Sequence, residues 1–233
     1  MVKAGYPADG MVRLHELLVR ESGREPGLLE AMFSSHPMSR ERRDSAQEAA
    51  QLQFATSRNA PAGRERYMDN TAPLRALIPT IQACQKGELL MSRKKPDQAE
   101  SHFRQALAHA PADYPSLLRM SQSLRAQGKR RDALEFARQA RSAYPTEAQA
   151  MKHLASLHMA ARAHDQALAE LNAFNRVLPG DPGIGFLRGV NQEALGQRDA
   201  ATQSFRAFLK QVPQGTQAQY AQGRLKAWGV SAN

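Results

Sequence analysis

The most constraining feature of this 233-residue sequence is the spacing of four of its prolines, which recur at one constant interval of thirty-four positions. An alanine stands twelve residues before each of these prolines, and an alanine or a phenylalanine stands five residues before. Chance rarely produces such a register, because only 13 residues of the chain are proline. A fixed period of this length predicts one supersecondary unit that is repeated four times and buries its apolar surface by stacking. The residues in register are Pro111, Pro145, Pro179 and Pro213; Ala99, Ala133, Ala167 and Ala201; and Ala106, Ala140, Phe174 and Phe208.

Each unit has the pattern of two amphipathic helices joined by a turn. In the second unit, Leu117, Met120 and Leu124 recur at the three-and-four spacing of one helical face, which predicts a helix over 116–127. A second helix is predicted over 130–143, where several alanines make a flat face that allows close approach. The glycine between the two helices supplies the backbone freedom that a helix end needs, and the closing proline cannot continue the second helix.

The period, the small residue where two helices would cross and the closing proline resemble the tetratricopeptide repeat. In the first repeat, Gly87, Ala99, Phe103, Ala106 and Pro111 fall on the signature positions of that family. The resemblance implies an all-α solenoid of helical hairpins, in which each repeat contacts its neighbours. The repeats are expected at 80–113, 114–147, 148–181 and 182–215, followed by a capping helix and tail at 216–233.

Solenoids of this family usually bind peptides or partner proteins along the concave surface, which the first helix of each hairpin lines. Arg125 and Lys152 could pair there with a carboxylate, and Met91 and Met159 could adapt to apolar side chains. The paired Lys, Asn and Arg of a carboxylate clamp do not occur in this register. Ordinary core packing is an equal alternative for the methionine and leucine positions. The repeat register places the following residues on the concave surface: Cys84, Glu88, Met91, Leu118, Gln122, Arg125, Lys152, Ser156, Met159, Phe186 and Val190.

The formal net charge of +10 belongs almost entirely to the repeats. Residues 80–233 hold 21 Lys or Arg against 12 Asp or Glu, whereas residues 1–79 hold 11 against 10. This basic field favours acidic protein or peptide clients through long-range attraction, although a set of solvated helix faces would have the same composition. Nucleic acid is not favoured as a partner, because aromatic residues make up only 6% of the chain and no nucleic-acid-binding motif occurs.

Other features limit the setting in which the chain works. No run of eighteen apolar residues occurs, so no transmembrane segment is predicted, and residues 1–30 lack the apolar core of a signal peptide. Cys84 is the single cysteine, which excludes an internal disulfide. Residues 59–79 have the composition of a linker with a leading helix into the first repeat.

The segment before this linker, 1–58, does not follow the repeat. Helices are predicted over 11–18 and 40–56, with a loop containing Phe33-Ser34-Ser35-His36-Pro37 between them. The order of Lys3-Ala4-Gly5-Tyr6-Pro7, this loop and Arg40-Glu41-Arg42 resembles the closing part of the M48 zinc metallopeptidase domain. Bacterial members of the periplasmic outer-membrane quality-control type often carry tetratricopeptide repeats directly afterwards. The resemblance implies that this segment is the C-terminal remnant of such a domain.

Zinc catalysis in that family needs His-Glu-x-x-His on a helix and an acidic third ligand. His15-Glu16-Leu17-Leu18-Val19 lacks the second histidine, and no two histidines of the chain are four residues apart. Zinc is therefore implied only for a full-length parent, and this chain alone has no catalytic or complete metal site. His36 would face the zinc cleft of that parent, or would merely cap its loop beside Pro37. Met1 is expected to be an internal start in a longer zinc metalloendopeptidase, the alternative being a naturally shortened, non-catalytic relative.

Together these features predict the protein-interaction module of an M48-type zinc metalloprotease. The module would recruit client proteins or dock to the outer-membrane assembly machinery. Its periplasmic location is implied by the resemblance alone. The alternative from another class is a stand-alone tetratricopeptide adaptor or scaffold with no enzymatic parent.

Overall fold

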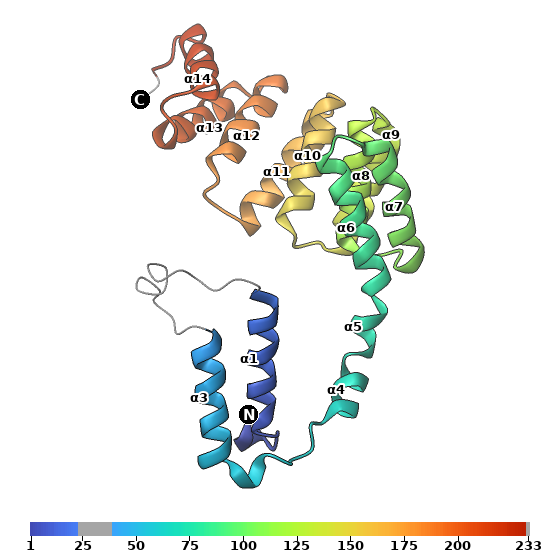
Figure 1. Cartoon of the computed structure of the whole chain (residues 1–233). Coiled ribbons are helices and arrows are strands. Elements are labelled where there is room, and N and C mark those ends of the chain that lie inside the picture. The colour runs from blue at the N-terminus through green and yellow to red at the C-terminus, as the bar shows by residue number, and fades with distance from the viewer. Residues whose placement is uncertain (23–38, 232–233) are drawn as a thin grey trace. The chain divides into compact units, whose positions relative to one another are not determined.

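The computed structural model describes residues 1–22 and 39–231, and Figure 1 shows the chain. Its contacts divide the chain into two compact units, Met1–Arg75 and Ala76–Asn233. Every regular element among the described residues is a helix, so the predicted all-α fold class is confirmed. None of the described helices combines the length and the apolar character that a membrane crossing needs.

The first unit is built on a hairpin of two helices, α1 Asp9–Ser22 and α3 Ser39–Leu52, which pack against each other. The ends of this hairpin are also tied together, because Arg58 pairs with the carboxylate of Asp9 at 2.9 Å. The loop predicted to contain His36 lies outside the described residues.

Helix α3 ends earlier than the sequence predicts. The amide of Phe54 donates to the carbonyl of Ala49 at 3.0 Å, and a hydrogen bond of this span closes the helix at Leu52, four residues before the predicted end. Four short helices complete this part of the chain. They are η1 Val2–Ala4, η2 Ala55–Ser57, α4 Arg64–Asn70 and α5 Ala72–Ala76.

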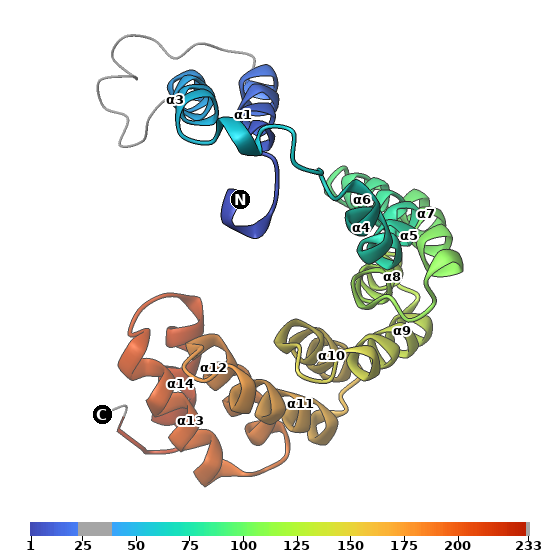
Figure 2. The same ribbon diagram turned by 90° about the horizontal axis from the view of Figure 1, so that it is seen from below.

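The second unit is a solenoid of four helical hairpins within residues 76–231, followed by α14 Thr216–Ala227. Figure 2 shows the first helix of each hairpin along the inner side of the curve and the second helix along the outer side. Neighbouring hairpins contact each other in chain order, as in a tetratricopeptide solenoid. The hairpins are α6 Ile78–Ser92 with α7 Pro96–His109, α8 Tyr114–Ala126 with α9 Arg130–Ala143, α10 Ala148–Ala160 with α11 His164–Val177, and α12 Pro182–Ala194 with α13 Arg198–Gln211.

The proline period also sets where the first helices begin. Asp113, Glu147 and Asp181 each stand two residues after a register proline. Their carboxylates accept hydrogen bonds from backbone amides in the first turn of the next helix, at 3.0, 3.2 and 2.8 Å respectively. A carboxylate at this place satisfies a free amide and complements the helix dipole. Each of these three prolines thus ends one hairpin, and the acidic residue that follows begins the next.

The core repeats with the same period. The four register alanines are completely buried where the two helices of each hairpin cross. At a second pair of core positions, a small residue on the first helix faces a residue of varying size on the second helix. The residue on the second helix is phenylalanine only where the facing residue is glycine, and its ring then packs directly on the glycine backbone. The pairs in chain order are Gly87 with Phe103, Ser121 with Ala137, Ala155 with Leu171, and Gly189 with Phe205.

Replacing Gly189 with alanine should destabilise the fourth repeat, because the new Cβ would lie 2.6 Å from the ring of Phe205. Overpacking of this kind costs about 1–3 kcal/mol, which outweighs a gain of about 1 kcal/mol in helix propensity. Gly185 on the same helix is the matched control, because a Cβ there meets nothing within 4 Å. Thermal unfolding should show a lower Tm for Gly189→Ala and an equal or higher Tm for Gly185→Ala. A rise for both variants would contradict the packing.

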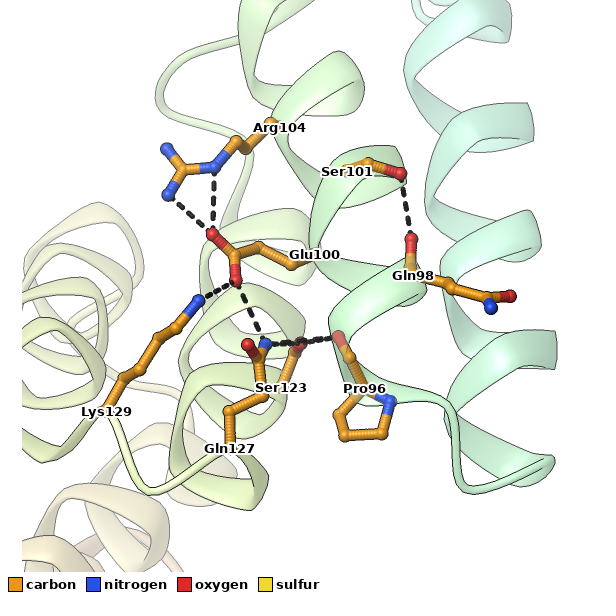
Figure 3. A network of polar contacts seen from close by, with 8 residues as sticks. All are labelled: Pro96, Gln98, Glu100, Ser101, Arg104, Ser123, Gln127 and Lys129. Atoms are coloured by element: carbon orange, nitrogen blue, oxygen red, sulfur yellow. Dashed lines mark hydrogen bonds and ion pairs between the residues drawn. The ribbon is translucent and has the colours of Figure 1, made fainter.

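A half-buried carboxylate joins the first repeat to the second (Figure 3). Glu100 on α7 accepts hydrogen bonds from Lys129 at 2.7 Å, Gln127 at 3.0 Å and Arg104 at 2.6 Å. Beside it, the hydroxyl of Ser123 donates to the carbonyl of Pro96 at 2.6 Å. The side chain of Glu100 is only 12% exposed, so these bonds are shielded from water. The network fixes the start of α7 against the turn between α8 and α9.

The Glu100 network should make stability depend on pH. The hydrogen bond from Lys129, helped by Arg104 and Gln127 against the opposing effect of burial, lowers the pKa of Glu100 to about 2. The unfolded chain binds the proton near the ordinary value of 4.5, so the stabilisation is present above pH 4.5 and is lost as the pH falls towards 2.

Glu100→Gln should therefore lower Tm at pH 7 and reduce the loss of Tm between pH 4.5 and 2. The exposed Glu135 on α9, whose carboxylate accepts a bond from Gln139, is the control. If Tm falls by the same amount between pH 4.5 and 2 in Glu100→Gln and in the parent chain, this role of Glu100 is ruled out.

Candidate functional site

The candidate site is the inner face of the solenoid. We define the inner face by exposed and half-buried side chains of the first helices and of α14. Each of these residues either occupies a position of the predicted concave register or forms a bond to a residue at such a position. The members of the inner face are Glu88, Met91, Arg119, Gln122, Arg125, Lys152, Ser156, Met159, Phe186, Val190, Glu193, Tyr220 and Arg224.

Polar side chains bridge successive first helices at a constant sequence separation. Arg119 donates to Glu88 at 2.6 Å, and Arg125 donates to the hydroxyl of Ser156 at 2.9 Å, and each pair is 31 residues apart. Glu193 on α12 forms an ion pair with Arg224 on α14 in the same way. The separation is three residues less than the repeat period, and side chains three residues apart share one helix face. The same geometry is therefore used between three pairs of helices.

Lys152 is held at the junction between the third and fourth repeats. Its ammonium group lies 3.2 Å from the carboxylate of Asp181, which also begins α12, and 5.7 Å from the ring centre of Phe174. The half-exposed Lys152 therefore has both an acidic and an aromatic neighbour, and its charge is largely satisfied within the protein.

Arg125 is positioned differently. The hydroxyl of Ser156 donates to the carbonyl of His153 at 2.7 Å, so its oxygen is left to accept from the guanidinium of Arg125. No carboxylate among the described residues pairs with Arg125, and its side chain is exposed. The structure thus holds this cation in place without neutralising it.

The buried side chain of His153, whose pKa the charge of Arg125 helps to lower, stays neutral. The hydroxyl of Ser121 donates to the carbonyl of Ala133 at 2.6 Å, so it accepts from Nε2 of His153 at 2.7 Å, which assigns the ring hydrogen to Nε2. Burial, followed by the charge of Arg125, lowers the pKa of His153 to about 4. At neutral pH the positive charge at this point of the inner face therefore belongs to Arg125.

The end of the inner face nearest α14 is aromatic. The ring of Phe186 lies 5.2 Å from that of Phe208 and 5.8 Å from that of Tyr220, centre to centre. Tyr220 is 43% exposed and donates to the carboxylate of Glu193 at 3.0 Å. Phe186 and Val190 pack against the core of this last repeat, so much of their apolar surface is already used.

Two residues of the predicted concave set belong to the core instead. Leu118 is 2% exposed and packs with Leu117 and Ala140, and Cys84 is 8% exposed, with burial raising the pKa of its thiol. Neither side chain is available to a partner on the inner face. Met91 and Met159 are half-buried, and Met91 also packs against the core of the first repeats.

Four inner-face residues were not predicted from the sequence. Tyr220 and Arg224 lie one repeat period after Phe186 and Val190, so extending the register into α14 would have found both. Glu193 likewise lies one period after Met159. Arg119 is defined by its bond to Glu88, and only the structure shows that contact.

A metal site is not formed by the part of the chain that the structure describes. Within residues 1–22 and 39–231, no three His, Cys, Asp or Glu side chains are placed to hold an ion. The predicted cleft residue His36 is outside these ranges, so its relation to zinc stays a prediction.

Comparison with known families identifies the repeats. Tetratricopeptide repeat models match residues 118–182 and 185–215. These two segments are therefore similar to tetratricopeptide repeats, as the proline register predicts. These matches lie outside residues 1–58 and give no support to the predicted peptidase remnant. No curated protein sequence matches the chain significantly.

Several solved structures have the same fold, and two of the three described here are tetratricopeptide repeat proteins by their description. MamA from Desulfovibrio magneticus RS-1 is 15% identical, with 64% of this chain and 86% of that chain covered and a TM-score of 0.58. YrrB, described as having an unusual peptide-binding site, is 18% identical, with 70% and 83% covered and a TM-score of 0.59. A protein from Parabacteroides merdae ATCC 43184 is 21% identical, with 64% and 59% covered and a TM-score of 0.58. At these identities the likeness concerns the fold.

Proposed function

We propose that the solenoid binds an extended polypeptide segment along its inner face and that Arg125 pairs with an acidic side chain of that segment. Tetratricopeptide repeats are protein-interaction modules, and YrrB, a protein of the same fold, has a peptide-binding site. The partner chemistry is inferred from the inner face of this chain.

The observation that supports an acidic partner is the unsatisfied charge of Arg125. Arg119, Lys152 and Arg224 each pair with a carboxylate from a neighbouring repeat. Arg125 is oriented by Ser156 but meets no carboxylate among the described residues. An incoming carboxylate would form a charge-assisted bond without first breaking an internal ion pair.

The repeat register also gives the spacing of the expected segment. Met91, Arg125 and Met159 occupy the same position in three consecutive repeats. Packed helices lie about 8–10 Å apart, and a peptide in the polyproline II conformation advances about 9 Å in three residues and returns every third side chain to the same side. Side chains three residues apart in the ligand would therefore meet successive members of this row. The inner face should favour an acidic residue with an apolar residue three positions before it and three after it.

The peptide Leu-Ala-Ala-Glu-Ala-Ala-Leu, blocked at both ends, tests this proposal by fluorescence polarisation on the full chain. Replacing its Glu with Gln should weaken binding about tenfold, the loss of one charge-assisted bond. Arg125→Gln should weaken binding of the Glu peptide equally and should abolish the preference for Glu over Gln.

Arg131→Gln is the matched control, because Arg131 is an exposed arginine on α9 outside the inner face. It should retain the preference. Equal affinity of the parent chain for the Glu and Gln peptides would refute the acidic contact. If the losses of binding free energy from Arg125→Gln and from the Glu-to-Gln change in the peptide simply add, Arg125 does not contact the Glu side chain.

We also propose that residues 1–58 derive from the end of an M48-type zinc peptidase domain, and that the repeats recruit its clients or dock it to an envelope assembly in the periplasm. The order of the Gly5-Tyr6-Pro7 turn, the Ser35-His36-Pro37 loop and the four repeats supports this proposal. The competing function is a stand-alone adaptor, which requires no His-Glu-x-x-His.

The coding sequence upstream of Met1 distinguishes the two functions. An in-frame His-Glu-x-x-His followed by an acidic ligand is expected if the repeats serve a protease. An in-frame stop codon close upstream would instead support the adaptor.

A further inference from the structure

An open pocket of about 510 Å³ lies between the second helices of the second and third repeats. Because α9 and α11 lie on the outer side of the solenoid (Figure 2), this pocket is separate from the inner face. Its lining comes from three helices and from Pro145 in the loop between α9 and α10. The side chains that the argument uses are Arg138 and Arg141 from α9, Leu154 and His158 from α10, and Gln166 and Glu170 from α11.

His158 is the unusual member of this lining. The residue is 5% exposed, and its Nδ1 is completely covered with no hydrogen-bond partner among the described residues. Buried polar groups nearly always have a partner, as His153 does five residues earlier with Ser121. Burial and the charge of Arg138, opposed by Glu170, lower the pKa of His158. The ring is therefore neutral at pH 7 and has one N–H to donate.

The two arginines of the pocket differ in what they bond. Arg141 is occupied, because it donates to the carboxylate of Glu170 at 3.1 Å and to the carbonyl of Pro145. Arg138, three residues earlier and so on the same face of α9, is exposed and forms no ion pair with any described residue. The arginines exceed the single acidic residue of the lining by one charge.

From this arrangement we propose that the outer pocket binds a carboxylate group. Arg138 would hold it by a charge-assisted pair, and the N–H of His158 would donate a second hydrogen bond. Because Nδ1 is covered, the ring atom that meets the ligand is Nε2, while Leu154 contacts the methylene groups of the acid. An acidic side chain of a polypeptide and a free dicarboxylic acid share this chemistry, and a pocket of this volume accommodates either.

The test uses the full chain labelled with ¹⁵N at histidine and two probes, the blocked peptide Ala-Glu-Glu-Ala and glutarate, at constant ionic strength. The ring resonances of His158, assigned by their loss in His158→Leu, should shift on titration with at least one probe. The blocked peptide Ala-Gln-Gln-Ala should not shift them. A shift with the Glu peptide identifies an acidic polypeptide as the ligand, and a shift with glutarate alone identifies a free acid.

Arg138→Gln should weaken the binding about tenfold, and this exposed residue can be changed without disturbing the core. Arg131→Gln on the same helix should have no comparable effect, and Arg125→Gln should leave the outer pocket unchanged while it weakens the inner face. The two sites therefore fail independently. If neither probe shifts the His158 resonances, or if Arg138→Gln leaves the affinity unchanged, the proposed carboxylate site is wrong.

His158→Leu separates a ligand-binding role from a structural one. Removing an unpartnered buried nitrogen should leave Tm of the free chain equal or higher, whereas the rise of Tm that a saturating probe gives the parent chain should disappear. A substantially lower Tm of the free variant, with the probe-induced rise retained, would show that His158 serves the fold alone.

Discussion

The second unit depends on one packing constraint, which is that a single hairpin cannot bury its own apolar face. The four register alanines, each completely buried, let the two helices of every hairpin approach closely at the same height. The glycines opposite Phe103 and Phe205 allow the same close approach of the two helices where the second helix carries a large ring. Because all hairpins have the same dimensions, they stack in a constant register.

The constant register explains why function can reside in single residues of each repeat. One position of the first helix recurs along the inner face as Met91, Arg125, Met159 and Glu193. Packing fixes where these side chains lie, and their chemistry is free to vary. Arg125 differs from the other members of this row because it is an exposed cation that Ser156 orients and that no carboxylate of the described residues neutralises. On the outer side, the same stacking places second helices from neighbouring repeats beside each other and creates the pocket that contains Arg138 and His158.

The sequence predicts those features that depend on periodicity. Prolines, crossing alanines and apolar spacing predict four hairpins and a final helix, because each reports a backbone or packing requirement that recurs once in every repeat. Periodicity predicts less well which face a side chain occupies. Leu118 has the register of the inner face, yet it is buried, because its neighbours Leu117 and Ala140 enclose it.

Contacts between residues without a fixed period could not be predicted. The network around Glu100 joins residues 27 and 29 positions apart, and only the stacking shows that they meet. The turns give a further example. The left-handed conformation at Gly128 and Gly196 recurs at Lys94 and Arg162, with φ of 58° and 57°, although neither is glycine. The amides of Lys95 and Ala163 donate to the carbonyls of Leu90 and His158, both at 2.9 Å, so helix-end hydrogen bonds hold a conformation that the local sequence disfavours.

Hydrogen–deuterium exchange of the full chain, with and without the peptide Leu-Ala-Ala-Glu-Ala-Ala-Leu, tests most directly whether the inner face is the binding surface. We expect the peptide to slow exchange in α6, α8 and α10, which hold Met91, Arg125 and Met159, and we expect Arg125→Gln to reduce this effect in α8. Slower exchange confined to the second helices, or to residues 1–75, would contradict this account.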